Sequence, residues 1–186
     1  KDPDPEEYMD IMKRTDGQVA RWSLAPELPG AHDMARTLKA RGVLMAYGHT
    51  DASFEECEDA FNAGFTHMTH FFSGMSTVSR NGIYRRAGAV EYGYYNDDVT
   101  VELIGDGIHV PASMLKMTYK IKGADNIALV TDSIRAAGLP DGEYEVTFKT
   151  DSSMFRINEA LHDTARLTVK DGEMTVHITL VSKNIL

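Results

Sequence analysis

Residues 47–75 read YGHTDASFEECEDAFNAGFTHMTHFFSGM, and this stretch decides the fold. An apolar run over 43–47, VLMAY, leads into it and is typical of a parallel strand buried on both faces. A helix is expected over 53–63, because a serine and a glutamate three residues apart form a capping box and a glycine follows the last helical position. A second strand is expected over 65–72. The stretch therefore predicts a strand–helix–strand unit of a parallel α/β protein.

The same alternation continues on both sides of this unit. Strands are expected over 19–24, 99–103 and 127–130, and helices over 5–15, 32–41 and 111–123. Strands that alternate with helices at this rhythm predict one parallel sheet. The segment 73–98 is rich in Gly, Asn, Ser and Tyr, and at about 25 residues it is long for a plain connection, so we expect a functional loop there.

After residue 142 the pattern changes. Apolar and polar residues alternate over 144–149, and an Asp-Gly pair at 171–172 stands in the middle of an alternating run over 167–178. An Asp-Gly pair between two alternating stretches is a strong hairpin signal. The tail is therefore predicted to be antiparallel β structure.

The composition is that of an ordinary globular protein: 186 residues, 42% hydrophobic, with a formal net charge of −9. The acidic balance argues against nucleic acid or an anionic membrane as the main partner, while a local arginine can still hold a small anion. No apolar run approaches the ~18 residues of a membrane span, and no signal peptide is visible. The single cysteine, Cys57, fits a reducing compartment, so a cytoplasmic protein is expected. Because Lys1 is not preceded by an initiator methionine, we expect the interior of a longer protein.

Polar side chains follow the predicted strands at their carboxyl ends. These ends carry Glu27, His49, His70, His109 and Asp132. In parallel α/β folds the active-site groups cluster at this edge of the sheet. His49 and His70 are neutral nitrogen donors of the type that Zn²⁺ or Fe²⁺ prefers, so we interpret them as two ligands of one divalent metal ion. The alternative is that both rings only cap or hydrogen-bond the strand ends.

The other histidines are expected to be structural. His67 lies three residues before His70, and this odd offset points its side chain to the opposite face, toward the helix layer, so it is excluded as a ligand. His32 falls on a predicted helix outside the sheet, and His177 falls on the polar side of the predicted tail hairpin. His162 is assigned a structural role as well.

Four further residues are candidates for chemistry. Asp132 follows four apolar residues, where a carboxylate is costly unless it is paired or used, so it is either a metal ligand or the base that takes a proton from water. His109 closes the turn sequence GDGIH and could polarise a substrate carbonyl or donate to a leaving group. Arg85 and Arg86 are either solvated surface charge or a bidentate clamp for a phosphate or carboxylate.

Five motifs together resemble one family. They are GHTDA at 48–52, THMTHFF at 66–72, GDGIH at 105–109, LVTD at 129–132 and AGLPDG at 137–142. They occur in the order seen in the N-acetylglucosamine-6-phosphate deacetylase family of the amidohydrolase superfamily, and the resemblance covers roughly residues 19–144. It implies an incomplete (β/α)8 TIM-like barrel, of which 1–142 would be the C-terminal portion with about the last five strand–helix units. The stretch 143–186 would be a β-rich tail that departs from the family.

The resemblance also implies an activity. It implies hydrolysis of the N-acetyl group of N-acetylglucosamine 6-phosphate to glucosamine 6-phosphate and acetate, by a protein that is a homodimer when complete. The cofactor would be a divalent metal ion, with Zn²⁺ first and Fe²⁺ or another divalent ion as alternatives. His49 and His70 would bind it together with a glutamate from a strand upstream of Lys1, and Asp132 would be the catalytic acid/base.

The implied substrate contacts lie in three further places. His109 would contact the substrate near the scissile amide, and Arg85 would bind the phosphate. Ser73 and Gly74 would contact the sugar phosphate, at a place where the family usually has Asn-Ala. Two alternatives stay open: a related amidohydrolase with another N-acyl or cyclic amide substrate, and an inactive truncated barrel fused to a β binding module.

Overall fold

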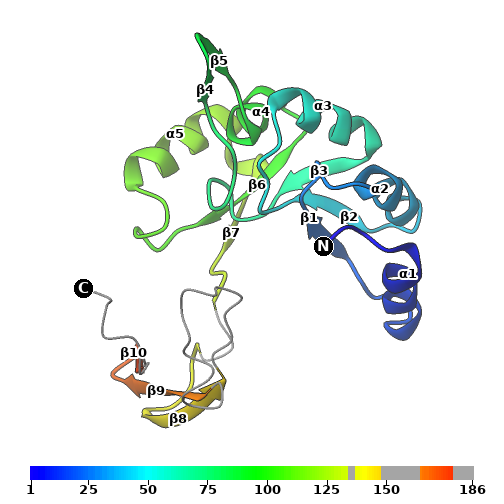
Figure 1. Cartoon of the computed structure of the whole chain (residues 1–186). Coiled ribbons are helices and arrows are strands. Elements are labelled where there is room, and N and C mark those ends of the chain that lie inside the picture. Colours follow the sequence, from blue (N-terminus) through cyan, green and yellow to red (C-terminus); the bar gives the residue numbers. More distant parts are fainter. Residues whose placement is uncertain (134–136, 148–163, 178–186) are drawn as a thin grey trace. The chain divides into compact units, whose positions relative to one another are not determined.

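The computed structural model describes residues 1–133, 137–147 and 164–177 (Figure 1). Its contacts divide the chain into two compact units, Lys1–Asp132 and Ser133–Leu186. The described part of the first unit has a five-stranded sheet and a two-stranded hairpin, and that of the second has a three-stranded sheet. The expectation that 1–142 is the C-terminal portion of a barrel and 143–186 a β-rich tail of uncertain origin stays a prediction.

All strands of the large sheet are parallel. They are β1 (Arg21–Leu24), β2 (Leu44–Tyr47), β3 (Phe65–Met68), β6 (Thr100–Ile104) and β7 (Ile127–Val130), in the order β1-β2-β3-β6-β7. Each strand therefore pairs with the strand of this sheet that precedes it in the chain. A doubly wound sheet reverses its strand order at a switch point, and this sheet runs in one direction throughout. The predicted α/β architecture with a parallel sheet is confirmed.

Helices cover one side of this sheet. They are α2 (Ala31–Lys39), α3 (Phe54–Ala63), α4 (Ala89–Tyr95) and α5 (Ala112–Lys122), while α1 (Pro5–Arg14) precedes β1. Figure 1 shows α2 to α5 along the outer side of the strands, as crossovers of one hand require for this strand order. Large apolar side chains such as Leu38, Tyr47 and Phe65 are fully buried between the two layers. Each buried side chain of this kind contributes about 1.5–3 kcal/mol to folding.

The opposite face of the sheet carries a polar cluster in which Glu102 and His67 are buried and Arg21 is partly exposed. The Arg21 guanidinium of β1 pairs with the Glu102 carboxylate of β6. His67 of β3 lies between, with Nε2 3.2 Å from Glu102 Oε1 and Nδ1 2.6 Å from Thr100 Oγ1. Trp22 and Leu24 of β1 pack against the core on the helix side of the sheet. Because side chains alternate along a strand, Arg21 faces away from the helices. The prediction that His67 faces the helix layer is therefore wrong.

The reason lies in how β3 ends. The odd-offset argument assumes regular alternation from His67 to His70. The pairing of β3 with β2 shifts its register between Met45 and Ala46, and β3 stops at Met68. His70 then lies in the turn that follows, with φ of 34°. Parity along the chain no longer relates the two side chains once the backbone has left the strand.

The segment 73–98 has more regular structure than a loop. It forms the antiparallel hairpin of β4 (Ser79–Asn81) and β5 (Tyr84–Arg86), which projects from the first unit in Figure 1, followed by α4. The two strands are short and exposed, and so they carry no alternating apolar signal. Within α4, a Cβ on Gly93 would come 2.6 Å from Met68 Sδ, so this glycine permits close packing of the helix on β3.

The second unit confirms the predicted antiparallel hairpin over its described residues. Its strands are β8 (Gly142–Thr147), β9 (Thr164–Lys170) and β10 (Glu173–His177), in the order β10-β9-β8. Asp171 and Gly172 both have positive φ, 53° and 80°, as a two-residue turn of this kind requires. His162 lies outside the described residues. Among the helices that the structure describes, none has the length and apolarity to cross a bilayer.

Candidate metal and catalytic site

Three of the predicted site residues share one backbone position. His49, His70 and Asp132 each lie two residues past the end of a parallel strand, β2, β3 and β7 respectively. Their φ angles are 48°, 34° and 51°, in the left-handed region. Non-glycine residues in this region carry a cost of about 1–3 kcal/mol and cluster at active sites. The strand order brings all three positions to the same edge of the sheet.

The histidines after β2 and β3 are in contact. The Nε2 atoms of His49 and His70 lie 3.1 Å apart, and their ring planes are 81° from parallel. Two nitrogens that share a tetrahedral Zn²⁺ at about 2.0–2.1 Å are roughly 3.3 Å from each other. His70 is buried, and its Nδ1 has no hydrogen-bond partner among the described residues. The rings thus fit two ligands of one metal ion, and a hydrogen bond between them is the alternative.

Ser73 and Gly74 lie against this histidine pair. The Ser73 N–H donates to the His70 carbonyl oxygen (2.9 Å), and the Thr50 N–H donates to the Gly74 carbonyl oxygen (2.8 Å). Gly74 has φ of 59°, and a Cβ there would come 2.9 Å from His49 Nδ1. The structure therefore brings together the predicted residues His49, His70, Ser73 and Gly74. It also gives Gly74 a role in placing the His49 ring.

The turn that carries His70 is fastened to β6 by Glu102. Glu102 Oε2 accepts from the His70 N–H (3.3 Å), and its backbone carbonyl oxygen accepts from the Phe71 N–H (2.8 Å). The pKa of His67 is lowered to about 4, mainly by burial and to a smaller extent by the positive charge of Arg21. His67 is therefore neutral near pH 7, with its Nδ1 in a hydrogen bond with Thr100 Oγ1 and its Nε2 3.2 Å from the Glu102 carboxylate. Glu102 was not singled out from the sequence, where the only signal is one acid inside the apolar run VELI.

Glu27 supports the other histidine turn. Its carboxylate accepts from the Thr50 hydroxyl (2.5 Å) and from the Asp51 N–H (2.8 Å). Both donors follow His49 directly in the chain. Glu27 is one of the five strand-end residues that the sequence indicates. In this structure it supports the turn after β2.

His109 belongs to a separate group after β6. Its Nδ1 lies 2.7 Å from Asp106 Oδ2, and the side chains are 56% and 38% exposed respectively. Asp132 is exposed at the end of β7. Arg85 is exposed on β5 and stands opposite Arg80 in the hairpin register. Among the described residues, no hydrogen bond or ion pair joins these side chains to the histidine pair, so their assigned roles stay predictions.

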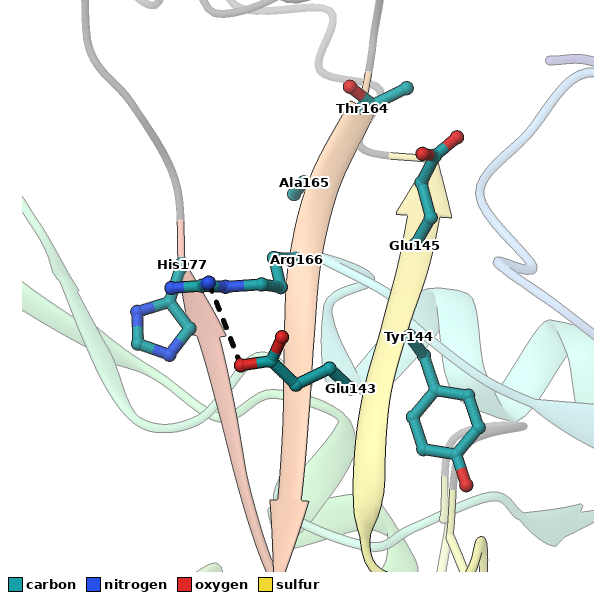
Figure 2. A pocket seen from close by; sticks show the side chains of 7 residues that line it. All are labelled: Glu143, Tyr144, Glu145, Thr164, Ala165, Arg166 and His177. Carbon is teal, nitrogen blue, oxygen red and sulfur yellow. Dashed lines mark ion pairs between the residues drawn. The ribbon is translucent and has the colours of Figure 1, made fainter.

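A hollow of about 440 Å³ lies elsewhere, on the polar face of the second unit. Figure 2 shows the side chains that line it. Arg166 of β9 forms an ion pair with Glu143 of β8, with Nη1 3.6 Å from Oε1, and lies beside His177 of β10. Its lining contains none of the residues that the sequence predicts for the site.

A parallel α/β sheet with two contacting imidazoles beyond its carboxyl edge is an arrangement that metal-dependent hydrolases with strand-end ligands also use. No protein-family model matches the chain. Comparison with known proteins finds relatives of a narrower kind, which are named as deacetylases. The chain is 35% identical over 142 residues to N-acetylglucosamine-6-phosphate deacetylase of Lysinibacillus sphaericus. This alignment covers 74% of this chain and 36% of the relative. It is 37% identical over 123 residues to N-acetylgalactosamine-6-phosphate deacetylase of Escherichia coli O157:H7, covering 66% of this chain and 31% of the relative.

Solved structures agree with these relatives. A variant of N-acetyl-D-glucosamine-6-phosphate deacetylase from Mycobacterium smegmatis, in complex with N-acetyl-D-glucosamine-6-phosphate, matches with a TM-score of 0.72 and 27% identity. The match covers 99% of this chain and 42% of that structure. The resemblance expected from the motifs is confirmed. The chain spans about a third of the length of the curated relatives it matches, 36% for the Lysinibacillus protein.

Proposed function

We propose that the complete protein containing this chain hydrolyses the N-acetyl group of N-acetylglucosamine 6-phosphate, giving glucosamine 6-phosphate and acetate. The observation that carries the proposal is the pair of Nε2 atoms of His49 and His70, 3.1 Å apart at the ends of neighbouring parallel strands. It occurs in a chain that is 35% identical to deacetylases of this substrate.

The fold proposed for the complete protein is a (β/α)8 barrel, to which this chain contributes five consecutive strands. The unreversed strand order and the helices on one side support it. So does Leu129 on the outermost strand β7, whose side chain is 79% exposed and would be covered by a neighbouring element.

His49 and His70 would hold the divalent metal ion, with Zn²⁺ as the proposed species. No group of three or more candidate ligands occurs within the described residues, so the remaining protein ligand would come from another part of the complete protein. When bound, the ion would supply an activated water molecule and polarise the amide carbonyl. The paired imidazole nitrogens, and the Nδ1 of His70 that has no hydrogen-bond partner among the described residues, are the features that fit such an ion.

The chain's own side chains would handle the proton and the substrate. Asp132 would accept the proton of the attacking water and then give it to the leaving amine. With Nδ1–H held by Asp106, His109 would donate a hydrogen bond from Nε2 in its doubly protonated form to the carbonyl oxygen of the acetamide, where negative charge develops. Arg85 would anchor the phosphate: it faces Arg80 directly across the hairpin, and two facing cations repel each other unless an anion lies between them.

The proposed setting is a cytoplasmic homodimer in amino-sugar metabolism. Burial, and next the charges of Glu27 and Glu56, raises the pKa of Cys57 to about 12, so this thiol stays protonated and inert. A lone buried thiol needs no oxidising compartment.

The test of the mechanism is acetate release by the complete protein from N-acetylglucosamine 6-phosphate. Asp132→Asn should lower kcat by about 100-fold or more, because the amide cannot take up the proton. Asp125→Asn, a change of the same kind just before β7, should leave kcat unaltered. Equal turnover by the Asp132→Asn variant and the unaltered protein would contradict the assigned role.

A second substrate is favoured by one observation, the 37% identity to an N-acetylgalactosamine-6-phosphate deacetylase. The two sugars differ only in the configuration of one hydroxyl group. Assaying both phosphates side by side, with the unphosphorylated N-acetyl sugars as controls, separates these candidates. A preference for an unphosphorylated amide would favour a related amidohydrolase with another substrate.

A further inference from the structure

The loop after β6 is organised by one carboxylate. Asp106 Oδ1 accepts from the N–H groups of Ile108 and His109, each at 2.9 Å. Its other oxygen, Oδ2, lies 2.7 Å from Nδ1 of the His109 ring. The three contacts use both carboxylate oxygens, so the same side chain fixes the turn and the imidazole.

This arrangement decides which ring nitrogen is free. A carboxylate only accepts hydrogen bonds, so the proton between the two side chains belongs to His109 Nδ1. Nε2 is then the ring atom left for a substrate. It accepts a hydrogen bond when the ring is neutral and donates one when the ring is a cation beside the carboxylate. The hydrogen bond from the ring, followed by those from the two N–H groups, lowers the pKa of Asp106 to about 2, so the carboxylate is charged throughout the physiological range.

We propose that Asp106 is a positioning residue, which holds His109 with Nδ1–H on its carboxylate and so presents Nε2 to the substrate. The inference rests on the proposed function for its catalytic meaning, but the state of the ring does not depend on turnover. An aspartate of this kind differs from a purely structural turn former, because its second oxygen contacts the ring and not the backbone.

The first test is the ¹⁵N spectrum of the histidine rings in the 186-residue chain at pH 9, where an ordinary imidazole is neutral. The unaltered chain should show His109 protonated at Nδ1. In Asp106→Asn the amide oxygen can still accept from the two backbone N–H groups, while its NH₂ group faces Nδ1. The ring should therefore switch to the Nε2–H tautomer, with little change in the backbone signals of residues 105–110.

Asp125→Asn is the matched control and should leave the His109 signals unchanged. Asp106→Ala removes the backbone contacts as well and should shift the signals of the whole turn. An Nε2–H tautomer in the unaltered chain, or the same tautomer in the unaltered chain and in Asp106→Asn, would overturn the proposal.

The second test is a double-mutant cycle on acetate release by the complete protein. Asp106→Asn alone should lower kcat/KM by about 100-fold, mainly through kcat. Added to His109→Ala it should cost nothing further, because Asp106 acts through the ring. Equal losses from Asp106→Asn with and without the ring would overturn the proposal. Absence of acetate release by the unaltered protein would overturn the proposed function alone, since the ring tautomer is measured without substrate.

Discussion

The Nε2 atoms of His49 and His70 lie 3.1 Å apart although 21 positions of chain separate the two residues. Helix α3 and the parallel pairing of β2 with β3 create this contact. If the pair holds a divalent ion, His49→Ala and His70→Ala in the complete protein should each lower its Zn²⁺ affinity by more than about 100-fold, which exceeds the loss expected for an outer-shell partner. A competition titration with a chromophoric chelator measures it. His177→Ala is the control, and an affinity that all three variants share with the unaltered protein would contradict the assignment.

Gly74 offers a way to disturb His49 without replacing it. A methyl group on Gly74 would come 2.9 Å from His49 Nδ1, and the residue has φ of 59°. Gly82 has nearly the same φ, 63°, with no atom within 4 Å, so Gly82→Ala carries the backbone strain alone. Both variants should lose about 1 kcal/mol of unfolding free energy to the strain. Only Gly74→Ala should also weaken Zn²⁺ binding, and equal binding by both variants would show that the contact with the ring has no effect.

His67 makes folding stability depend on pH. Its pKa is about 4 in the folded chain and about 6.5 when unfolded, so the unfolded state binds more protons between these values. Stability should therefore rise as the pH increases from 4 to 6.5 and level off above. The full effect is on the order of 3 kcal/mol.

Urea denaturation of the chain at several pH values measures this dependence. His67→Gln keeps a polar side chain but does not titrate, so its stability should rise less steeply over the same range. Parallel curves for His67→Gln and the unaltered chain would show that His67 titrates alike in both states.

If Arg85 binds the phosphate beside Arg80, replacing Arg85 should reduce the selectivity for phosphorylated substrates. Arg85→Ala in the complete protein should raise KM for N-acetylglucosamine 6-phosphate by about 10- to 100-fold, the range expected for a charged hydrogen bond. Turnover of unphosphorylated N-acetylglucosamine should change little. Arg41→Ala, at the end of α2, is the control. A KM for the sugar phosphate that stays constant in Arg85→Ala would assign this arginine to solvated surface charge.

Local signals predicted much of the first unit. The capping box of Ser53 and Glu56 is present, with the Glu56 N–H on Ser53 Oγ (3.2 Å) and the Ser53 N–H on the Glu56 carboxylate (2.7 Å). The ends of the strands can also be predicted from the local sequence, because an apolar run stops where the chain reaches the edge of the sheet. The contact of His49 with His70 then follows from the pairing of two adjacent parallel strands.

What the sequence could not predict depends on distant partners. The face of His67 is set by a register shift against β2 and by the early end of β3, and neither changes the pattern of residue types. Glu102 of β6 meets both the His70 N–H and the Arg21 guanidinium of β1 only in the folded sheet, because these residues are far apart in the chain. Gly74 similarly meets the His49 ring through tertiary structure.

The most direct measurement is acetate release from N-acetylglucosamine 6-phosphate by the complete protein before and after removal of divalent ions with a chelator. Release should stop in the chelated protein, return with added Zn²⁺, and fail to return in the His70→Ala variant. Full activity of the chelated protein, or no release by the untreated protein, would contradict the proposed metal-dependent deacetylation.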